Sequence, residues 1–310
     1  MYLENFNLQE MPFSITPDTQ FFFNQSCHQE GLNVLLISLR SGEGFIKITG
    51  EVGTGKTLLC RKLLNEIEDE FVTAYIPNPF MSSRALYLGV AEELGVQGKN
   101  VAEHQLVKLI TKRLIEIRAQ GKKAVLCIDE AQAMPLGTLE AVRLLTNLET
   151  EKSKLLQVVI FGQPELDERL SHPSVRQLKQ RISFSYSLTP LDKRNVKNYI
   201  HHRMSVAGYR GKPIISSSGV RELYRASRGV PRLINIICNK ALLSAYGQGK
   251  HEIRKKHITR AINDTESTAP RRRIVSNVWW FGLVTGAGII AIGYNFYASQ
   301  LINIVQRFVQ

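Results

Sequence analysis

Several familiar site patterns are missing from this 310-residue sequence. Its four cysteines include no CxxC pair, and its seven histidines form no HExxH motif. These absences argue against a disulfide framework and against the common zinc sites, and they place the main body in a reducing cytosol. No internal repeat and no long low-complexity tract is visible. Because 44% of the residues are hydrophobic, the chain has enough apolar material for a packed core and is not disordered.

Acidic residues are scarce in one segment of the chain. Between Lys193 and Arg273 there are 19 Lys and Arg against four Asp and Glu, although the whole chain has a net charge of only +13. The basic character therefore belongs to this segment and indicates an anionic partner. Anionic lipid head groups are the first interpretation, because an apolar stretch follows shortly after. DNA phosphates are the minority interpretation.

Charge of either sign is absent between Ile274 and Gln306. Residues 278–298 are apolar enough to predict a transmembrane helix, since about 20 such residues at about 1.5 Å each cross a bilayer. Arginines precede this stretch at 271–273, whereas only Arg307 follows it. The positive-inside rule then places residues 1 to about 275 in the cytoplasm and the tail, 299–310, on the other side. The start of the chain has no signal peptide pattern.

Short runs rich in β-branched and aromatic residues alternate with helical patterns in the first part of the chain. Such alternation predicts βαβ crossovers and a parallel five-stranded sheet covered by helices on both faces, a three-layer α/β fold. The predicted strands are Phe45–Thr49, Phe71–Ile76, Ala124–Asp129, Leu155–Gly162 and Ile182–Leu188. A lead-in of about 30 residues, with turn signals and an aromatic cluster at Phe21–Phe23, precedes the first strand.

Strand signals stop after Pro190, and only helical patterns follow. The predicted helices are Asp192–Ala207, Ser217–Ser227, Pro231–Tyr246 and His257–Asp264. They indicate a small all-helical second domain. The expected plan is 1–190 for the α/β core with its lead-in, 191–264 for the helical domain, 265–277 for a basic linker, 278–298 for the transmembrane helix and 299–310 for a periplasmic tail.

The most specific motif is a phosphate-binding loop. Its residues match GxxxxGK[ST]: Gly50, Glu51, Val52, Gly53, Thr54, Gly55, Lys56 and Thr57. A predicted strand precedes it and a predicted helix, which begins at Leu58, follows it, as the motif requires. The glycines let successive N–H groups face phosphates at a helix N-terminus. We expect residues 50–58 to bind ATP, with Lys56 at the β- and γ-phosphates and Thr57 on Mg²⁺.

Two carboxylates end the apolar strand that starts at Ala124. Asp129 and Glu130 thus lie at the carboxyl end of a buried strand, where α/β folds place their ligand sites. Asp129 is expected to hold the Mg²⁺ shell, as the corresponding Asp does in P-loop NTPases. Glu130 is expected to act as the general base that polarises the attacking water. Together with the loop, this pair predicts an ATPase that turns ATP and water into ADP and phosphate.

The order of motifs resembles a known family. After the phosphate loop come Asp129-Glu130-Ala131-Gln132, then residues 158–166 (VVIFGQPEL), then Gly229-Val230-Pro231-Arg232. This order looks like the AAA+ ATPases of the ExeA or general-secretion-pathway A type, and within them the MshM-like members associated with the mannose-sensitive haemagglutinin type IV pilus. The resemblance covers roughly residues 1–265. It implies a helical lid after the AAA+ core and a place at the bacterial inner membrane.

The resemblance also implies roles for single residues. Gln163 falls at the sensor 1 position, and Arg232 falls at the sensor 2 position on the lid. Arg181 falls where an arginine finger would reach the γ-phosphate of a neighbouring subunit, with Arg176 as its rival. The implied partners are further copies of the chain, in a ring or dimer, and inner-membrane proteins of a pilus or secretion apparatus. A DNA-acting ATPase of the loader kind and a scaffold that scarcely turns over are the alternatives.

Overall fold

A parallel sheet of five strands forms the centre of the computed structural model, which describes residues 2–24, 27–98, 101–151 and 153–265. The strands are β1 (Phe45–Gly50), β2 (Phe71–Ile76), β3 (Lys123–Ile128), β4 (Gln157–Gly162) and β5 (Phe184–Leu188). Their order is β2-β3-β4-β1-β5, so β1 pairs with both β4 and β5. The predicted α/β fold with a parallel five-stranded sheet is confirmed. Every strand end lies within two residues of its expected position.

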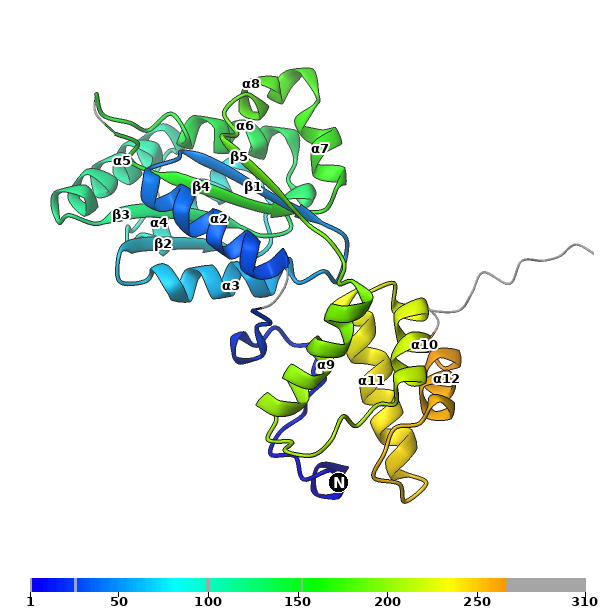
Figure 1. The fold of residues 1–310 in the computed structure, drawn as a ribbon. Coiled ribbons are helices and arrows are strands. Elements are labelled where there is room, and N and C mark those ends of the chain that lie inside the picture. The colour runs from blue at the N-terminus through cyan, green and yellow to red at the C-terminus, as the bar shows by residue number, and fades with distance from the viewer. Residues whose placement is uncertain (1, 25–26, 99–100, 152, 266–310) are drawn as a thin grey trace, which may run out of the picture. The chain divides into compact units, whose positions relative to one another are not determined.

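Alternation of side chains along each strand builds a separate core on each face of the sheet. In β1, Ile46 and Ile48 pack against one pair of helices, whereas Phe45 faces the other side. The first face is covered by α2 (Cys27–Ser41) and α3 (Lys56–Ile67). The second is covered chiefly by α4 (Ser83–Glu93), α5 (Glu103–Ala119) and α6 (Leu136–Leu145). Figure 1 shows α2 in front of the sheet and α4, α5 and α6 behind it.

Short helices connect the last three strands. They are η2 (Ala131–Ala133), α7 (Glu165–Leu170), η3 (Pro173–Val175) and α8 (Arg176–Lys179). The side chain of Arg169 on α7 donates a hydrogen bond to the carbonyl of Met134. This bond ties α7, which follows β4, to the turn that follows β3. The carboxyl ends of the two strands are therefore held together by the connections that leave them.

The helical lid consists of α9 (Lys193–Val206), α10 (Ser217–Ser227), α11 (Pro231–Tyr246) and α12 (Lys255–Asn263). Polar caps set two of the helix starts: Asp192 accepts from the N–H of Asn195, and Ser216 accepts from the N–H of Gly219. Pro231 occupies the first turn of α11, where a missing N–H costs nothing. These local signals explain why the helix ends lie within two residues of those expected from the sequence.

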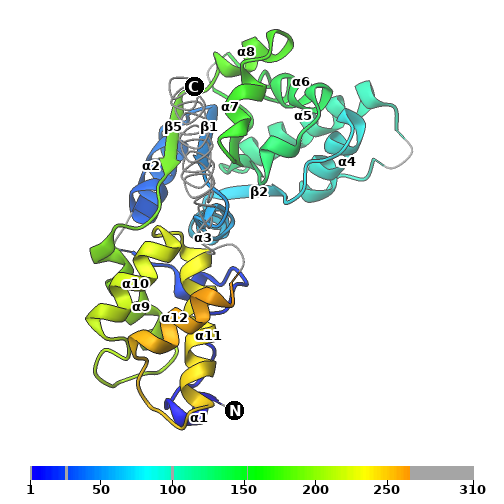
Figure 2. The ribbon, with the colours of Figure 1, turned by 90° about the vertical axis from the view of Figure 1, so that its right-hand side faces the viewer.

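The lead-in contributes to the core of the lid. It contains α1 (Tyr2–Asn5) and η1 (Thr19–Phe21), and its aromatic side chains pack among α9, α10, α11 and α12. These side chains are Tyr2, Phe6, Phe13, Phe21 and Phe23, whereas Phe22 packs against the α2 and α3 face of the sheet. The lead-in therefore contacts both the lid and the α2 and α3 face of the sheet. The sequence had predicted that it belongs to the α/β core alone. Figure 2 shows α1 beside the far end of α11.

The membrane localisation expected from the sequence is corrected by the structure. In the four described stretches, no helix is both long and apolar enough to cross a bilayer. The expected transmembrane helix, 278–298, and the tail, 299–310, lie outside the described residues. The prediction of a single-pass inner-membrane protein with a cytoplasmic N-terminal domain is therefore not retained.

Candidate functional site

The loop between β1 and α3 turns tightly, and two of its glycines have positive φ angles. Gly53 and Gly55 have φ values of +79° and +101°, a region that glycine adopts without the strain that a Cβ would cause. Thr54 is fully buried, and its hydroxyl donates to the carbonyl of Glu51 over 2.8 Å. Gly55 is the N-cap of α3, so the first N–H groups of this helix are available to an anion.

Lys56 is buried, although it is charged. Its side chain is only 5% exposed, and Nζ donates to the carbonyls of Gly50 at 2.8 Å and Glu51 at 3.1 Å. Burial lowers the pKa of Lys56, and the nearby carboxylates of Glu130 and Asp129 partly oppose this shift. A poorly hydrated cation whose hydrogen bonds, among the described residues, go to two neutral carbonyls favours an incoming polyanion such as a triphosphate.

Thr57 and Asp129 meet at the base of the loop. The hydroxyl of Thr57 donates to Oδ2 of Asp129 over 2.6 Å, and Asp129 is only 2% exposed. Burial raises the pKa of Asp129, while the bonds from Thr57 and from the N–H of Glu130 oppose that rise. A hydroxyl and a carboxylate are oxygen ligands that suit Mg²⁺, which usually completes its shell with phosphate oxygens and water. The pair could hold Mg²⁺ in this way.

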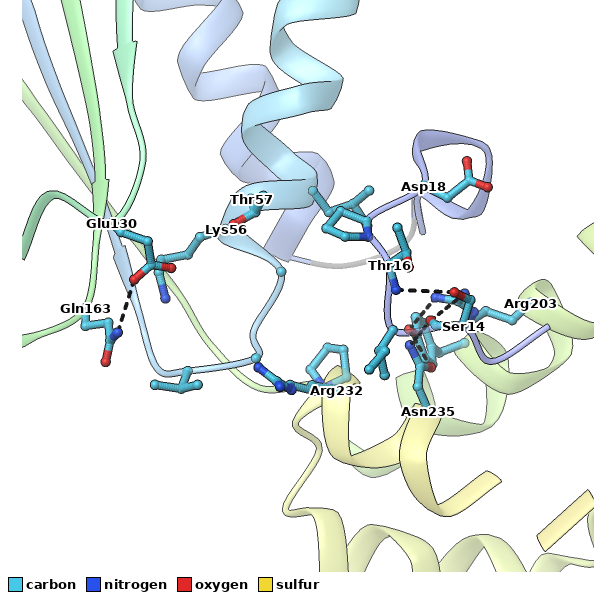
Figure 3. A pocket seen from close by; sticks show the side chains of 18 residues that line it. Ser14, Thr16, Asp18, Lys56, Thr57, Glu130, Gln163, Arg203, Arg232 and Asn235 are labelled. Carbon is cyan, nitrogen blue, oxygen red and sulfur yellow. Dashed lines mark hydrogen bonds between the residues drawn. The ribbon is translucent and has the colours of Figure 1, made fainter. Parts of the chain in front are cut away.

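Glu130 and Gln163 stand at the ends of neighbouring strands and face the same cavity (Figure 3). The backbone of Glu130 is left-handed, with φ at +50°, because the chain turns sharply from β3 into η2. Nε2 of Gln163 donates to Oε2 of Glu130 over 3.3 Å. A half-buried carboxylate beside an amide donor and close to Lys56 is a suitable general base for a bound water.

The lid and the lead-in complete the cavity, whose volume is about 340 Å³. Arg232 lies in the first turn of α11, and its backbone N–H donates to the carbonyl of Gly53 over 3.2 Å. Ser14–Asp18 of the lead-in form another part of the wall. Figure 3 shows the phosphate loop on one side of the cavity and Arg232 and Asn235 of the lid on the other. This size suits a nucleotide.

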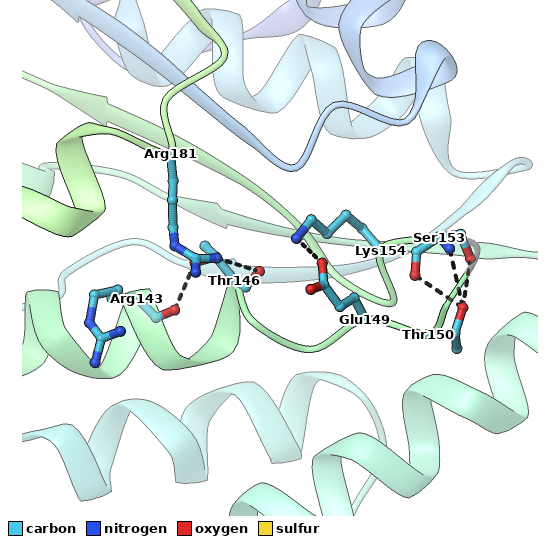
Figure 4. A network of polar contacts seen from close by, with 7 residues as sticks. All are labelled: Arg143, Thr146, Glu149, Thr150, Ser153, Lys154 and Arg181. Carbon is cyan, nitrogen blue, oxygen red and sulfur yellow. Dashed lines mark hydrogen bonds and ion pairs between the residues drawn. The ribbon is translucent and has the colours of Figure 1, made fainter.

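Arg181 does not line this cavity. Figure 4 shows it in a separate polar network, beside Thr146. It follows α8, and its guanidinium donates to the carbonyl of Thr146 over 3.4 Å. Both Arg181 and its rival Arg176 are exposed. The structure thus brings together the phosphate loop with Leu58, Asp129, Glu130, Gln163 and Arg232, and it does not bring Arg181 to them.

Some residues of the site were missed by the sequence analysis. His28 on α2 is buried, and its Nε2 lies 2.5 Å from the carbonyl of Thr54 in the phosphate loop. Gln132 bonds to Glu130, as described below, and Arg203 of α9 lines the cavity. No local pattern marks His28, whereas Gln132 ends the motif Asp129-Glu130-Ala131-Gln132, in which it was given no role. Arg203 had a signal, because it shares a helical face with the buried Val196, Tyr199 and Ile200.

Comparison with known proteins shows which proteins this chain resembles. Residues 39–170 match the family described as AAA domain. This stretch of the chain is therefore similar to AAA domains. The chain is also 40% identical, over 298 residues, to general secretion pathway protein A of Aeromonas hydrophila. This match covers 95% of this chain and 53% of that protein. This chain therefore spans about half the length of that relative.

Solved structures agree on the fold. CDC6P of Pyrobaculum aerophilum is 19% identical with a TM-score of 0.64, covering 82% of this chain and 70% of that one. The ORC1 protein of Aeropyrum pernix, solved in complex with DNA, is 17% identical with a TM-score of 0.62, covering 82% and 69%. At such identities the likeness concerns the fold alone.

The AAA domain match includes the phosphate loop, the Asp129–Glu130 pair and Gln163, and it ends before Arg181 and Arg232. The predicted resemblance to AAA ATPases of the general-secretion-pathway A type is confirmed by this match and by the Aeromonas relative. The narrower likeness to the MshM-like members stays a prediction.

Proposed function

We propose that this chain binds ATP with Mg²⁺, hydrolyses it, and thereby supports assembly of a type II secretion apparatus or of a type IV pilus of the mannose-sensitive haemagglutinin kind. The observation that carries the enzymatic part is that Lys56, Thr57 and Glu130 line one cavity of nucleotide size, and that Thr57 donates a hydrogen bond to Asp129. The assembly part is supported by the 40% identity to general secretion pathway protein A.

The proposed mechanism assigns each side chain one task. Lys56 exchanges its two carbonyl partners for phosphate oxygens, and the N–H groups at the start of α3 bind the same phosphates. Thr57 and Asp129 hold Mg²⁺, which neutralises phosphate charge when bound. Glu130 accepts the proton of the attacking water, and the amide of Gln163 orients that water. Arg232 closes the lid side of the cavity, where its guanidinium can bind a phosphate oxygen.

Loop and base variants test the enzymatic assignment. Lys56→Ala should abolish ATP binding, because it removes the cation that holds the phosphates. Glu130→Gln should still bind ATP, while hydrolysis falls by about 10²-fold or more, as expected for the loss of a general base. Binding of a fluorescent ATP analogue and release of phosphate, with and without EDTA, measure the two effects. Glu168→Gln, at an exposed carboxylate on α7, is the matched control. Hydrolysis by Glu130→Gln at the rate of the parent protein would contradict the assignment of Glu130 as the general base.

The same variants test the assembly role in the bacterium that carries the gene. Deletion should reduce surface pili, measured by mannose-sensitive haemagglutination, or secreted enzymes, measured in the culture medium. The parent gene and Glu168→Gln should restore whichever activity is lost, and Glu130→Gln should not. A deletion strain with normal pili and normal secretion would contradict the assembly role while leaving the ATPase assignment intact.

A DNA-acting ATPase is the second candidate, and the charge of the lid favours it. Arg221 and Arg225 are exposed on α10, and Arg228 is exposed at its C-cap. Glu222 is the nearby carboxylate, 3.9 Å from Arg225 and 3.8 Å from Lys255. A row of cations with so few acids suits a phosphate backbone. Stimulation of hydrolysis by duplex DNA that falls steeply with salt would favour this candidate.

A further inference from the structure

Gln132 joins the proposed base to the end of the neighbouring strand. It lies in η2, directly after Glu130 and Ala131. Its Nε2 donates to Oε2 of Glu130, and its Oε1 accepts from the backbone N–H of Gln163 over 3.0 Å. The side chain of Gln163 donates to the same Oε2. Two amides thus converge on one oxygen of the proposed base.

The orientation of the Gln132 amide is fixed by its partners. A backbone N–H can only donate, so the Gln163 end requires the carbonyl oxygen of Gln132. A carboxylate can only accept, so the Glu130 end requires the NH₂ group. The flipped amide would lose both bonds, which leaves one arrangement.

The surrounding backbone holds this amide in place. Ala131 is fully buried, and the N–H of Ala133 donates to the carbonyl of Glu130 over 2.8 Å. Gly162, the last residue of β4, lies so close that an added Cβ would stand 3.3 Å from Oε1 of Gln132. Gln132 is therefore packed over the end of β4 and has little freedom to swing away.

We propose that Gln132 is the positioning residue for Glu130. Its N–H group stabilises the ionised carboxylate and occupies Oε2, which leaves Oε1 to accept the proton of the water. Within the described part of the chain, Oε1 of Glu130 has no protein hydrogen-bond partner. Through the backbone of Gln163, the same amide makes the base and the proposed sensor move together. This inference rests on the proposed ATPase function.

Two substitutions separate the parts of this role. Gln132→Met keeps the length and volume of the side chain and removes both hydrogen bonds. Gln132→Glu keeps the acceptor for Gln163 and places a carboxylate against Glu130. Both should lower kcat by about 10-fold or more, while the affinity for ATP changes by less than about threefold, because neither contacts the phosphate loop.

A double-variant comparison decides whether Gln132 acts through Glu130. In a Glu130→Gln background, Gln132→Met should cause almost no further loss of kcat, since effects that pass through one residue are not additive. Gln120→Glu, at an exposed glutamine after α5, controls for added charge. Thermal unfolding and ATP affinity are measured for every variant.

Each outcome has one meaning. Parent-like kcat in Gln132→Met, with Glu130→Gln inactive, would overturn the positioning role alone. An equal loss of ATP affinity and kcat, or a full additive loss in the double variant, would show a merely structural role and would also overturn it. Parent-like hydrolysis in Glu130→Gln would instead overturn the proposed function.

Discussion

At the scale of single residues, His28 links α2 to the phosphate loop. The carbonyl of Thr54 can only accept, so Nε2 of His28 carries the hydrogen in the 2.5 Å contact. Burial lowers the pKa of His28 below its ordinary value of 6.5, and the bond to Thr54 opposes this shift only in part. The folded protein therefore holds this imidazole neutral at pH values where the unfolded chain would begin to protonate it.

This difference predicts how stability depends on pH. Because the unfolded state binds the proton first, the contribution of His28 is complete above pH 6.5 and is lost as pH falls below that value. Between about pH 6.5 and 5, the unfolding free energy of His28→Gln should fall less steeply with pH than that of the parent protein. The slope should differ by at most about 1.4 kcal/mol per pH unit. Urea unfolding at a series of pH values measures it, with exposed His104→Gln as the control. An unchanged slope would contradict the assignment.

At the scale of elements, the turn between α10 and α11 fixes how the lid meets the sheet. Gly229 in this turn has φ at +80°, and a Cβ there would lie 1.9 Å from the carbonyl oxygen of Leu191. Its own carbonyl accepts from the N–H of Leu191 over 2.9 Å. Leu191 follows β5, and α11 carries Arg232 into the cavity, so this contact sets the position of Arg232.

Gly229→Ala should therefore lower the unfolding free energy by more than the strain of a positive φ alone, because the added Cβ also collides with Leu191. Gly249 is the matched control, because its φ is +62° and an added Cβ would meet nothing within 4 Å. Gly249→Ala should lower the unfolding free energy by about 1 kcal/mol, whereas Gly229→Ala should lower it by about 2 kcal/mol or more and also weaken ATP binding. Denaturant unfolding and nucleotide titration measure both effects. An equal loss of unfolding free energy in the two variants would show that the turn around Gly229 accommodates a Cβ.

Local chemistry explains which elements the sequence could predict. The strand at Phe71–Ile76 and the helices that start at Ser217 and Pro231 were expected with the bounds they have, because apolar runs, caps and proline act within a few residues. The phosphate loop is likewise contiguous in the chain. The bond from Gln132 to Gln163 spans 31 positions, and that from Arg203 to Pro12 spans 191. Such pairs depend on how the layers meet, and no short pattern specifies that.

At the scale of the whole molecule, the described residues of the α/β core place no arginine in the cavity that could act as a finger within the same chain. Among the described residues of the AAA domain and its flanks, Arg176 and Arg181 are exposed and lie outside the cavity. An arginine placed in this way can serve a neighbouring copy, whose transition-state charge it would stabilise. We propose that Arg181 does so in a homo-oligomer, and this makes hydrolysis depend on assembly.

Mixed assemblies test this proposal. Arg181→Ala and Lys56→Ala should each be nearly inactive, and their mixture should recover part of the turnover, because some interfaces pair an intact finger with an intact loop. Specific activity of the parent should also rise with protein concentration. Phosphate release and light scattering measure the two quantities. If both variants fold and associate but the mixture stays inactive, Arg181 is excluded, and Arg176→Ala is tested in the same way.

The lead-in has a consequence for synthesis of the chain. The hydroxyl of Tyr2 donates to Asn239, 237 positions later, and the guanidinium of Arg203 stacks on Phe21 at 4.5 Å. Since a ribosome adds about 5–20 residues each second, these aromatic side chains wait roughly 10 to 40 s for their partners to emerge. During that time the sheet can be completed, whereas the lid cannot. The nascent chain thus carries an uncovered aromatic segment until the lid helices emerge and bury it, and a chaperone that shields such surfaces would bind it during that time.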